Sequence, residues 1–331
     1  MLNQKIKIGI IGGGHIVKTA HLPSYVENSD VEISGITDFD ANVEEKLNLR
    51  KLGIQFIAST EELLKRKDIE LVVVATPTDS HFEICSSALE LGKHVLCQKP
   101  LGGKIAPAIK LINLAEEKGL ILTVNDSFRW YPTFKKVKKI ISDGQIGDPF
   151  FTLFEDCGWS DFRAHEQLGD RFLLLRNSSH KLDLFRYWFG DNIKSIESKI
   201  EHVKHHNVKG ETLTTVSLKY ADNHLVQLID NGASSAPGYR RIVIHGTKGA
   251  VRVDDKSVEL FNKKHGIRSK WKRVQVEGSI IPHAFNGVLG TLIEKIKSGK
   301  EVYYDAKDYI NTLKLIENAY LSAQKKKTID L

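Results

Sequence analysis

Short apolar runs alternate with helical patterns through the first 125 residues of the chain. Leu71–Thr76 is a β-branched run, which is typical of a strand buried on both faces. Strands that alternate with helices predict a parallel, doubly wound sheet. The predicted strands are Ile6–Ile11, Val31–Thr37, Leu71–Thr76, His94–Cys97 and Ile121–Val124, and the longer predicted helices are His15–Val26, Asn42–Leu52 and Ile105–Lys118.

Serine residues mark the starts of two further helices. Ser59 with Glu62 forms a capping box, and Ser80 with Glu83 forms a second one. Gly92 fits the end of the second helix, because glycine commonly follows the last helical turn. We therefore expect a short helix after Ser59 and a longer one between Ser80 and Gly92.

The pattern changes after Pro149. Apolar and polar residues alternate with period two, and turns such as Asp222-Asn223 and Lys248-Gly249 separate the alternating segments. This alternation predicts an antiparallel sheet with one wetter face. The alternating segments are 215–220, 241–245, 251–253 and 258–260, and helical patterns cover His180–Phe189, Ala284–Lys297 and Lys307–Ala323.

The two patterns predict an α/β protein with two domains, which suits a length of 331 residues. We expect residues 1–125 to form the doubly wound domain. Residues 126–331 are expected to form an α+β domain with an open, mainly antiparallel sheet. The boundary between them falls between Asn125 and Pro149.

Composition and charge narrow the class of protein. Hydrophobic residues make up 41% and charged residues 27%, which are globular values. A lysine-rich solvated surface explains the net charge of +7, and no RNA-stacking aromatic motif accompanies the basic clusters. The three cysteines form no CxxC pair, no metal-binding spacing is present, and no stretch approaches membrane-spanning length. We therefore expect a cytoplasmic protein that binds no nucleic acid, membrane or metal.

A glycine motif follows the first predicted strand and opens the first helix. Gly12 and Gly14 fit the Gly-x-Gly-x-x-Gly/Ala dinucleotide fingerprint, whereas Val17 departs from its third position. Gly12 permits the tight turn, Gly14 lets the backbone approach a pyrophosphate, and the helix N-terminus offers N–H groups to the phosphates. Asp38 ends the second strand, where a carboxylate binds the ribose 2′-hydroxyl and repels a 2′-phosphate. The motif predicts a dinucleotide-binding domain that prefers NAD to NADP.

Further motifs follow in order along the chain. Gln98-Lys99-Pro100 lies at the carboxyl end of the fourth strand, where ligands of open α/β sheets bind, and His180–Asp183 opens a helix of the second domain. With the glycine motif, Ala75-Thr76-Pro77, Asn125–Pro132 and Tyr239–Ala250, this set resembles the glucose–fructose oxidoreductase/inositol dehydrogenase/MocA family over nearly the whole chain. The Gln-Lys-Pro variant is similar to a branch that includes aldose-type dehydrogenases, for example apiose dehydrogenases.

The resemblance implies a Rossmann domain and a second domain whose open sheet packs in homodimers or homotetramers. It also implies NAD(P)-dependent hydride transfer on a sugar, polyol or derivative. The family's lysine falls on Lys99, which would bind the reacting hydroxyl or shuttle its proton, and its histidine falls on His180, a general acid/base. The expected cofactor-binding residues are Gly12, Gly14, His15, Ile16, Asp38, Thr76, Pro77, His81, Gln98, Lys99 and Asn125.

Two positions depart from the family pattern. Gln98 stands where the family commonly has glutamate, and the missing negative charge favours a lower pKa for Lys99. Arg176 stands where the family often has aspartate, four residues before His180 and on the same face of a helix. His21 and His81 lie near the cofactor loops, and a surface or capping role also fits both.

Arg176 leaves three interpretations open. In the first, Lys99 is the main base while His180 stays neutral and positions the hydroxyl. In the second, Arg176 binds a phosphate or carboxylate of an anionic substrate. In the third, Arg176 points away and pairs with Asp170 or Glu166.

Other residues are candidates for substrate binding. Asp183 either replaces the missing carboxylate in part or forms an ion pair or cap of the helix. The polar segment Asp156–Asp170 has no period, so we expect a loop that covers the substrate, with Trp159 stacked on a sugar. Arg129 is a further candidate, whereas Trp130 is assigned to the core.

These observations predict an NAD(H)-dependent dehydrogenase that moves a hydride between nicotinamide and a hydroxyl or ketone of a sugar, cyclitol or derivative. One alternative is a sugar lyase or hydrolase that uses NAD for transient oxidation. Another is a non-catalytic NAD-binding protein, which the altered positions Gln98 and Arg176 would suit. The substrate, the direction of the reaction and the size of the oligomer stay open.

Overall fold

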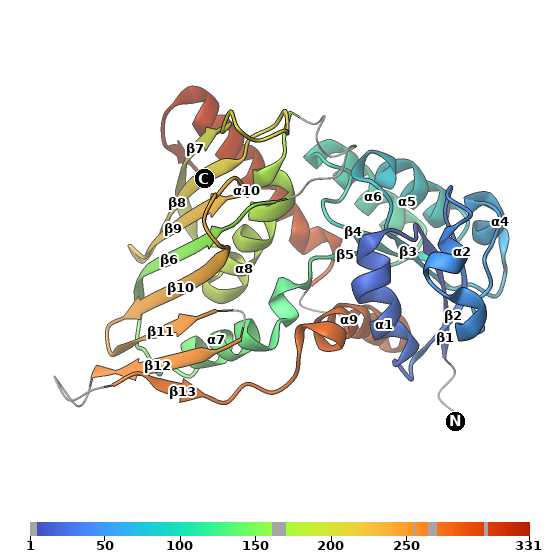
Figure 1. The fold of residues 1–331 in the computed structure, drawn as a ribbon, viewed down its shortest axis with the longest axis horizontal. Coiled ribbons are helices and arrows are strands. Elements are labelled where there is room, and N and C mark those ends of the chain that lie inside the picture. The colour runs from blue at the N-terminus through green and yellow to red at the C-terminus, as the bar shows by residue number, and fades with distance from the viewer. Residues whose placement is uncertain (1–4, 161–169, 255, 264–269, 301–303) are drawn as a thin grey trace. The chain divides into compact units, whose positions relative to one another are not determined.

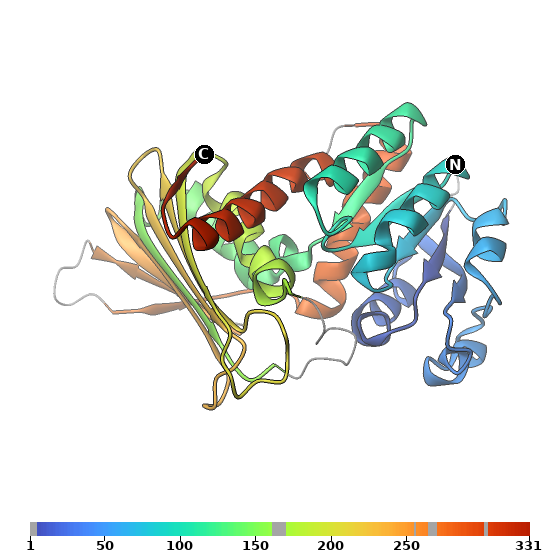
Figure 2. The same cartoon turned by 90° about the horizontal axis from the view of Figure 1, so that it is seen from above.

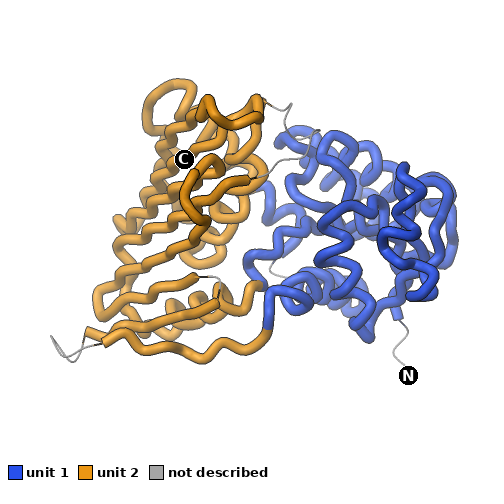
Figure 3. The backbone as a smooth tube through the Cα atoms, viewed as in Figure 1, with its two compact units in different colours: residues 1–130, 279–310 blue, residues 131–278, 311–331 orange. Residues whose placement is uncertain are grey.

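The structure is a computed structural model that describes residues 5–160, 170–254, 256–263, 270–300 and 304–331. The chain forms two compact units (Figure 3). Unit 1 contains residues 1–130 and 279–310, and unit 2 contains residues 131–278 and 311–331.

Unit 1 is built on a parallel five-stranded sheet, labelled in Figure 1. Its strand order is β2-β1-β3-β4-β5, so the order reverses between β1 and β3. Ligands of such sheets bind beyond the carboxyl ends of the strands at the reversal. The strands are β1 (Ile6–Ile11), β2 (Val31–Thr37), β3 (Leu71–Val74), β4 (His94–Gln98) and β5 (Leu122–Asn125), which confirms the five predicted strands.

Helices connect the strands of unit 1. The first helical segment changes from a π-helix, η1, to α1 within the predicted range. Later residues also return to this unit, through η6 and α9. The helices are η1 (Val17–His21), α1 (Leu22–Val26), α2 (Val43–Lys46), α3 (Leu49–Leu52), α4 (Thr60–Lys65), η2 (Thr78–Ser80), α5 (His81–Glu90), α6 (Ile105–Glu117), η3 (Ser127–Trp130), η6 (Ile280–Ala284) and α9 (Phe285–Ser298).

Two local expectations for these helices are wrong. The predicted helix Asn42–Leu52 is interrupted at Asn48, whose φ of +52° is left-handed, a conformation that asparagine tolerates. Ser80 does not cap α5, because its hydroxyl bonds to Thr76 Oγ1 and to the Pro77 carbonyl, each at 2.8 Å. By contrast, Ser59 Oγ accepts the backbone N–H of Glu62 at 3.1 Å, so this cap is confirmed.

The compact units divide after Trp130, and the segment 279–310 belongs to unit 1, whereas the sequence predicts domains of residues 1–125 and 126–331. Trp130 is 5% exposed, as expected for a core residue. Its ring packs edge-on against Tyr304 at 5.0 Å and lies so close to Gly287 that a Cβ there would meet Trp130 Cδ1 at 2.2 Å. Packing between such distant segments is not visible in a local pattern.

Unit 2 is built on a nine-stranded sheet among its described residues. The order is β13-β12-β11-β10-β6-β9-β8-β7-β14, and every pair is antiparallel except β6 with β9, which confirms a mainly antiparallel sheet. The strands are β6 (Pro149–Cys157), β7 (Ile193–Glu201), β8 (Leu213–Tyr220), β9 (Leu225–Asn231), β10 (Tyr239–Gly246), β11 (Gly249–Val253), β12 (Val258–Asn262), β13 (Lys272–Val274) and β14 (Ile329–Asp330).

Helices pack on one face of this sheet, as Figure 2 shows for α8 and the end of α10. Phe154 of β6 meets Phe185 of α8 edge to face at 5.9 Å, and Ser198 N of β7 donates to Ser322 Oγ of α10 at 3.0 Å. The helices are α7 (Pro132–Ser142), η4 (Leu174–Ser178), α8 (Ser179–Phe189) and α10 (Ala306–Lys325), which crosses between the units. Among the described helices, none is both long and apolar enough to cross a membrane.

Candidate active site

The glycine loop after β1 needs its glycines for space and for conformation. Gly12 has a φ of +99°, and a Cβ at this position would lie 2.7 Å from the carbonyl oxygen of Ala75. A Cβ on Gly13 would lie 2.2 Å from Val43 Cγ1. Gly14 is exposed and its carbonyl accepts the Lys18 N–H at 3.0 Å, so the N–H groups of the following turn are at a helix N-terminus.

Asp38 ties the end of β2 to this loop. Its Oδ2 accepts the Gly13 N–H at 2.6 Å, and its Oδ1 accepts the Asp40 N–H at 2.9 Å. An ionised carboxylate has about four acceptor sites, so Asp38 retains capacity for a hydroxyl group. The next residue, Phe39, is 97% exposed, so a solvent-exposed aromatic ring follows this carboxylate in the chain.

Neighbouring strands bring three predicted residues to one edge of the sheet. Val74 of β3 pairs with Cys97 of β4, and Gln98 pairs with Asn125 of β5. The segments that carry Thr76, Lys99 and Asn125 therefore lie at adjacent strand ends. Lys99 is partly exposed, whereas Asn125 is 2% exposed and its Oδ1 has no hydrogen-bond partner among the described residues.

His21 and His81 are buried, so the surface role considered for them is wrong. His21 Nε2 lies 2.6 Å from the amide nitrogen of Gln98, and its Nδ1 lies 2.7 Å from the Tyr25 hydroxyl. His81 lies between two carbonyl oxygens, with Nε2 2.9 Å from that of Thr76 and Nδ1 3.1 Å from that of Pro100. Both rings contact the segments that carry the predicted cofactor residues.

In unit 2, the helical segment formed by η4 and α8 carries Arg176 and His180. Both side chains are partly exposed, and the Arg176 guanidinium lies 5.6 Å from the Phe172 ring centroid. Asp170, one partner considered for Arg176, forms an ion pair with Lys209 at 2.7 Å. The other, Glu166, lies outside the described residues.

The contacts of Asp183 are internal to unit 2. This carboxylate is 0% exposed, accepts the Thr312 hydroxyl at 2.7 Å and pairs with Arg186 at 3.4 Å. These are the contacts of the helix ion pair, the alternative that the sequence left open. Arg129 is likewise 4% exposed within unit 1, where it pairs with Asp308 at 2.7 Å.

Part of the predicted loop Asp156–Asp170 is strand, because Asp156 and Cys157 end β6. The local sequence has no clear period, but pairing with β9 and β10 extends the strand through these residues. Trp159 is 47% exposed and stacks on His205 with ring centroids 5.6 Å apart. Phe162, Arg163 and His165 lie outside the described residues.

A buried charge network beside His180 was not visible in the sequence. Lys181 is 0% exposed, and its Nζ lies 2.9 Å from Oδ2 of both Asp156 and Asp230. Arg240 also pairs with Asp156, at 3.0 Å. Burial raises the pKa of Asp230 despite Lys181; burial also acts to raise the pKa of Asp156, but Lys181 and Arg240 outweigh it and hold that pKa below its usual range.

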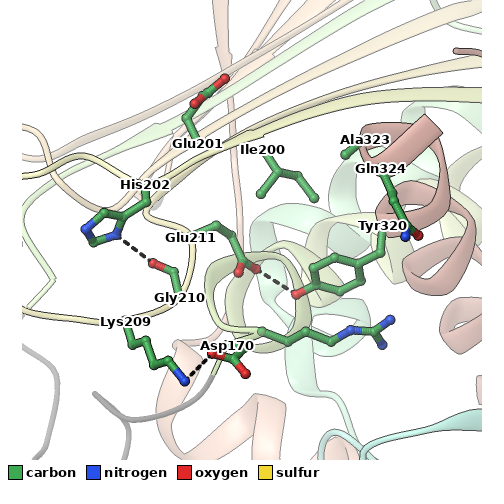
Figure 4. A pocket seen from close by; sticks show the side chains of 11 residues that line it. Asp170, Ile200, Glu201, His202, Lys209, Gly210, Glu211, Tyr320, Ala323 and Gln324 are labelled. Carbon is green, nitrogen blue, oxygen red and sulfur yellow. Dashed lines mark hydrogen bonds and ion pairs between the residues drawn. The ribbon is translucent and has the colours of Figure 1, made fainter. Parts of the chain in front are cut away.

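A separate cavity of about 420 Å³ opens within unit 2 (Figure 4). Glu211 at this cavity is 5% exposed and accepts the N–H groups of Phe172 and Leu174 and the hydroxyl of Tyr320, at 2.6–3.0 Å. The carboxylate thereby caps the helical segment that leads to His180. The lining residues are Asp170, Arg171, Ile200, Glu201, His202, Lys209, Gly210, Glu211, Tyr320, Ala323 and Gln324, and none of them is a predicted site residue.

Within the described ranges, no group of three or more His, Cys, Asp or Glu side chains is arranged to hold a metal ion. His202, His205 and His206 cluster in the sequence, a pattern that predicts solvated residues at a strand edge, but His206 is 5% exposed, so this prediction is wrong for His206. Its ring packs at 4.6 Å from Trp159, and its Nε2 lies 3.0 Å from the Ser160 carbonyl oxygen.

Known proteins match the chain over nearly its whole length. D-apiose dehydrogenase of Paraburkholderia graminis is 25% identical over 99% of this chain and 90% of its own. Myo-inositol 2-dehydrogenase of Thermotoga maritima is 24% identical over 98% of both chains. The crystal structure of an Agrobacterium radiobacter oxidoreductase, in complex with NAD+, L-tartaric acid and magnesium, has the same fold, with a TM-score of 0.87 at 22% identity over 99% of this chain and 98% of that one.

Two family models cover most of the chain. Residues 6–126 match the oxidoreductase family with an NAD-binding Rossmann fold, and residues 134–252 match the GFO/IDH/MocA C-terminal domain. The glycine loop, Asp38 and the strand ends of unit 1 all lie in the first match or at its border. The chain therefore belongs to the GFO/IDH/MocA family of oxidoreductases.

Proposed function

We propose that the protein is an NAD(H)-dependent dehydrogenase that transfers a hydride between nicotinamide and a hydroxyl or ketone of a sugar, cyclitol or derivative. The observation that carries the proposal is the edge of the parallel sheet, where the glycine loop, Asp38 and the ends of β3, β4 and β5 come together. Relatives named as apiose and inositol dehydrogenases support the substrate class.

The residues of unit 1 fit a dinucleotide. The turn at Gly12 has no space for a Cβ, and the exposed Gly14 lets a pyrophosphate approach the N–H groups of the helix N-terminus, including those of His15 and Ile16. Asp38 would hold the ribose, and Phe39 offers a ring on which an adenine can stack. The buried, unpartnered Oδ1 of Asn125 offers an acceptor at the strand ends. When bound, the nicotinamide supplies the hydride chemistry.

Lys99 and His180 are the proposed proton-transfer residues. Lys99 would hydrogen-bond the reacting hydroxyl or shuttle its proton, and the residue before it, Gln98, is neutral. His180 would act as a second acid or base. Thr76 and Pro77 would form the cofactor-facing loop after β3, and the buried His81 contacts this loop at the Thr76 carbonyl oxygen.

Within this proposal, Arg176 would bind an anionic group of the substrate, because a guanidinium binds a carboxylate or phosphate with two hydrogen bonds. The partly exposed side chain is compatible with such a contact. The exposed Trp159 ring would stack on the apolar face of a sugar. Asp183 and Arg129 are not part of the proposal, since their charges are paired in the interior.

We also propose a homodimer or homotetramer that forms through the open face of the sheet in unit 2. Phe151, Leu153 and Ile229 are only half-buried there, at neighbouring positions of β6 and β9. These side chains would become fully buried against a second sheet.

A substrate screen tests the proposed activity. We expect NADH to form when the protein is mixed with NAD and one or more members of a panel of aldoses, inositols, uronates and sugar phosphates. Activity limited to uronates or phosphates would support the role of Arg176, and activity limited to neutral sugars would contradict it. Bound NAD with no turnover on the panel, in either direction, would count against a dehydrogenase.

Coenzyme preference tests the role of Asp38. We expect Asp38→Asn to shift the ratio of kcat/KM for NADP over that for NAD upward by about tenfold or more, because a like charge facing a 2′-phosphate costs over 1 kcal/mol. The amide can still accept the Gly13 N–H. Steady-state kinetics with both cofactors measure the ratio, and Asp40→Asn, which changes a neighbouring carboxylate, serves as the control. An equal shift in both variants would refute the assignment.

A further inference from the structure

Two buried histidines hold the residues on either side of Lys99. On one side, His21 Nε2 lies 2.6 Å from the side-chain nitrogen of Gln98. On the other side, His81 Nδ1 lies 3.1 Å from the carbonyl oxygen of Pro100. The two histidines come from different helical segments, η1 and α5, and they are 0% and 1% exposed.

The protonation of His21 is set by its surroundings. Burial lowers its pKa to about 3, so the ring is neutral at physiological pH and carries one N–H. The side-chain nitrogens of Gln98 and Asn125 both face Nε2, at 2.6 and 3.2 Å, so Nε2 accepts. The N–H is therefore on Nδ1 and donates to the Tyr25 hydroxyl at 2.7 Å. The rings of Tyr25 and Phe285 also pack against the imidazole in T-shaped arrangements, each with ring centroids 5.2 Å apart, and these contacts restrict its orientation.

His81 joins two loops at the edge of the sheet. One ring nitrogen lies 2.9 Å from the Thr76 carbonyl oxygen, after β3, and the other faces Pro100, after β4. A carbonyl oxygen only accepts hydrogen bonds, so a ring nitrogen that carries a proton donates to the carbonyl oxygen that it faces, and a neutral ring donates to one of the two. Because the imidazole is rigid, it sets the spacing between these loops, and Lys99 lies in the second of them.

We propose that His21 and His81 are positioning residues that hold Gln98–Pro100 from both sides and thereby aim the amine of Lys99. This inference rests on the proposed function of Lys99. A lysine side chain has several rotatable bonds, so its amine can sample a region of limited size. The position of the backbone decides where that region lies. A displacement of about 1 Å in a reacting group can lower a rate by about a hundredfold.

The arrangement also accounts for an amide at residue 98. Gln98 donates to a neutral ring, whereas a carboxylate would need an N–H on Nε2 and would compete with the Tyr25 contact for the single proton of His21. The side chain of Gln98 is thus directed at a buried histidine. Gln98 would therefore contribute to the cofactor site indirectly, because its contact with His21 holds the backbone of residues 98–100 in place.

Kinetics of histidine variants test the proposal. We expect His81→Ala and His21→Ala to lower kcat roughly tenfold to a hundredfold, a larger factor than the accompanying change in the Kd for NAD. The control is His94→Ala, at the opposite end of β4, where His94 Nδ1 accepts the Ile121 N–H at 3.0 Å. If His94→Ala lowers kcat as much as the other two variants, the effect is general to the strand and the proposal is wrong.

A spectroscopic readout does not depend on turnover. Lysines are methylated reductively with ¹³C-formaldehyde, and the Lys99 signal is assigned by its loss in Lys99→Met. We expect this signal to move in His81→Ala and His21→Ala and to stay in place in His94→Ala. A Lys99 signal that stays in place in all three variants would overturn the proposal. By contrast, if the wild-type protein fails the substrate screen, the proposed function is contradicted, but the positioning of Lys99 by the two histidines is not.

Glutamine variants cover the case in which the alanine variants do not fold. His21→Gln keeps an acceptor for the Gln98 amide, and His81→Gln keeps an N–H donor for one of the two carbonyl oxygens. We expect both variants to retain more kcat than the alanine variants and a Lys99 signal nearer that of the wild type. The His81→Gln side chain cannot bridge both carbonyl oxygens. If this variant has the kcat of the wild type and an unmoved Lys99 signal, the proposed positioning role of His81 is also refuted.

Discussion

Replacing Lys99 by methionine is expected to lower kcat by about 10²–10⁴-fold, the usual contribution of a positioned proton-transfer group. Methionine keeps much of the length of the lysine side chain but has no proton to donate or accept. The glycine loop and Asp38 are unchanged in this variant, so the Kd for NAD should stay within about threefold. Steady-state kinetics on the substrate found in the screen and a direct NAD titration measure the two quantities.

Lys104→Met is the matched control for this prediction. Lys104 is exposed, lies five residues further along the chain and precedes α6 without a side-chain cap bond. We expect wild-type kcat from this variant. Turnover of Lys99→Met near the wild-type level would show that Lys99 is not the proton-transfer residue and would direct attention to His180.

Replacing Lys181 by methionine is expected to lower the free energy of unfolding by about 3–5 kcal/mol, the usual cost of removing one partner of a buried ion pair. Lys181 Nζ lies 2.9 Å from both Asp156 and Asp230, and the two carboxylates are opposite each other on β6 and β9. Without the ammonium, two like charges face each other in the interior. Arg240 still neutralises Asp156, whereas Asp230 keeps two neutral partners, the hydroxyl of Ser178 and the amide of Asn177.

Denaturant unfolding of three variants separates this effect from a loss of packing. Lys139→Met, which changes an exposed lysine on α7, should alter stability by less than about 0.5 kcal/mol. Adding Asp230→Asn to Lys181→Met should recover part of the loss, because the double variant no longer buries the unpaired carboxylate. A Lys181→Met protein as stable as the wild type, or a double variant less stable than Lys181→Met, would show that the network does not stabilise unit 2.

The fold of unit 1 follows closely from local patterns. The bounds of β1 and β2 match the predicted strands, because apolar runs between turn residues mark both ends of a buried strand. The helix is interrupted at Asn48 by a left-handed backbone conformation, which helical periodicity does not predict. The parallel pairing of β6 with β9 is also outside the pattern, since period-two alternation predicts a strand but not its neighbour.

The candidate site likewise contains residues that the sequence predicted and contacts that it did not. Gly12, Asp38 and Lys99 could be proposed because motif spacing and the ends of predicted strands place them. The contact of Arg129 with Asp308 and that of Asp183 with Thr312 could not, because these partners are 179 and 129 residues away. A charge that resembles a substrate ligand in the sequence is therefore buried in an ion pair in the structure.

By itself, the sequence determined the family, the parallel sheet, the glycine loop and the lysine at the end of a strand, because all of these are carried by neighbouring residues. Only the tertiary structure decided which charged and imidazole groups are buried. His21 meets Gln98 across 77 residues of chain, and Lys181 meets Asp230 across 49. Burial sets the charge state and the orientation of such groups, and it depends on which distant segments cover them rather than on their own sequence neighbours.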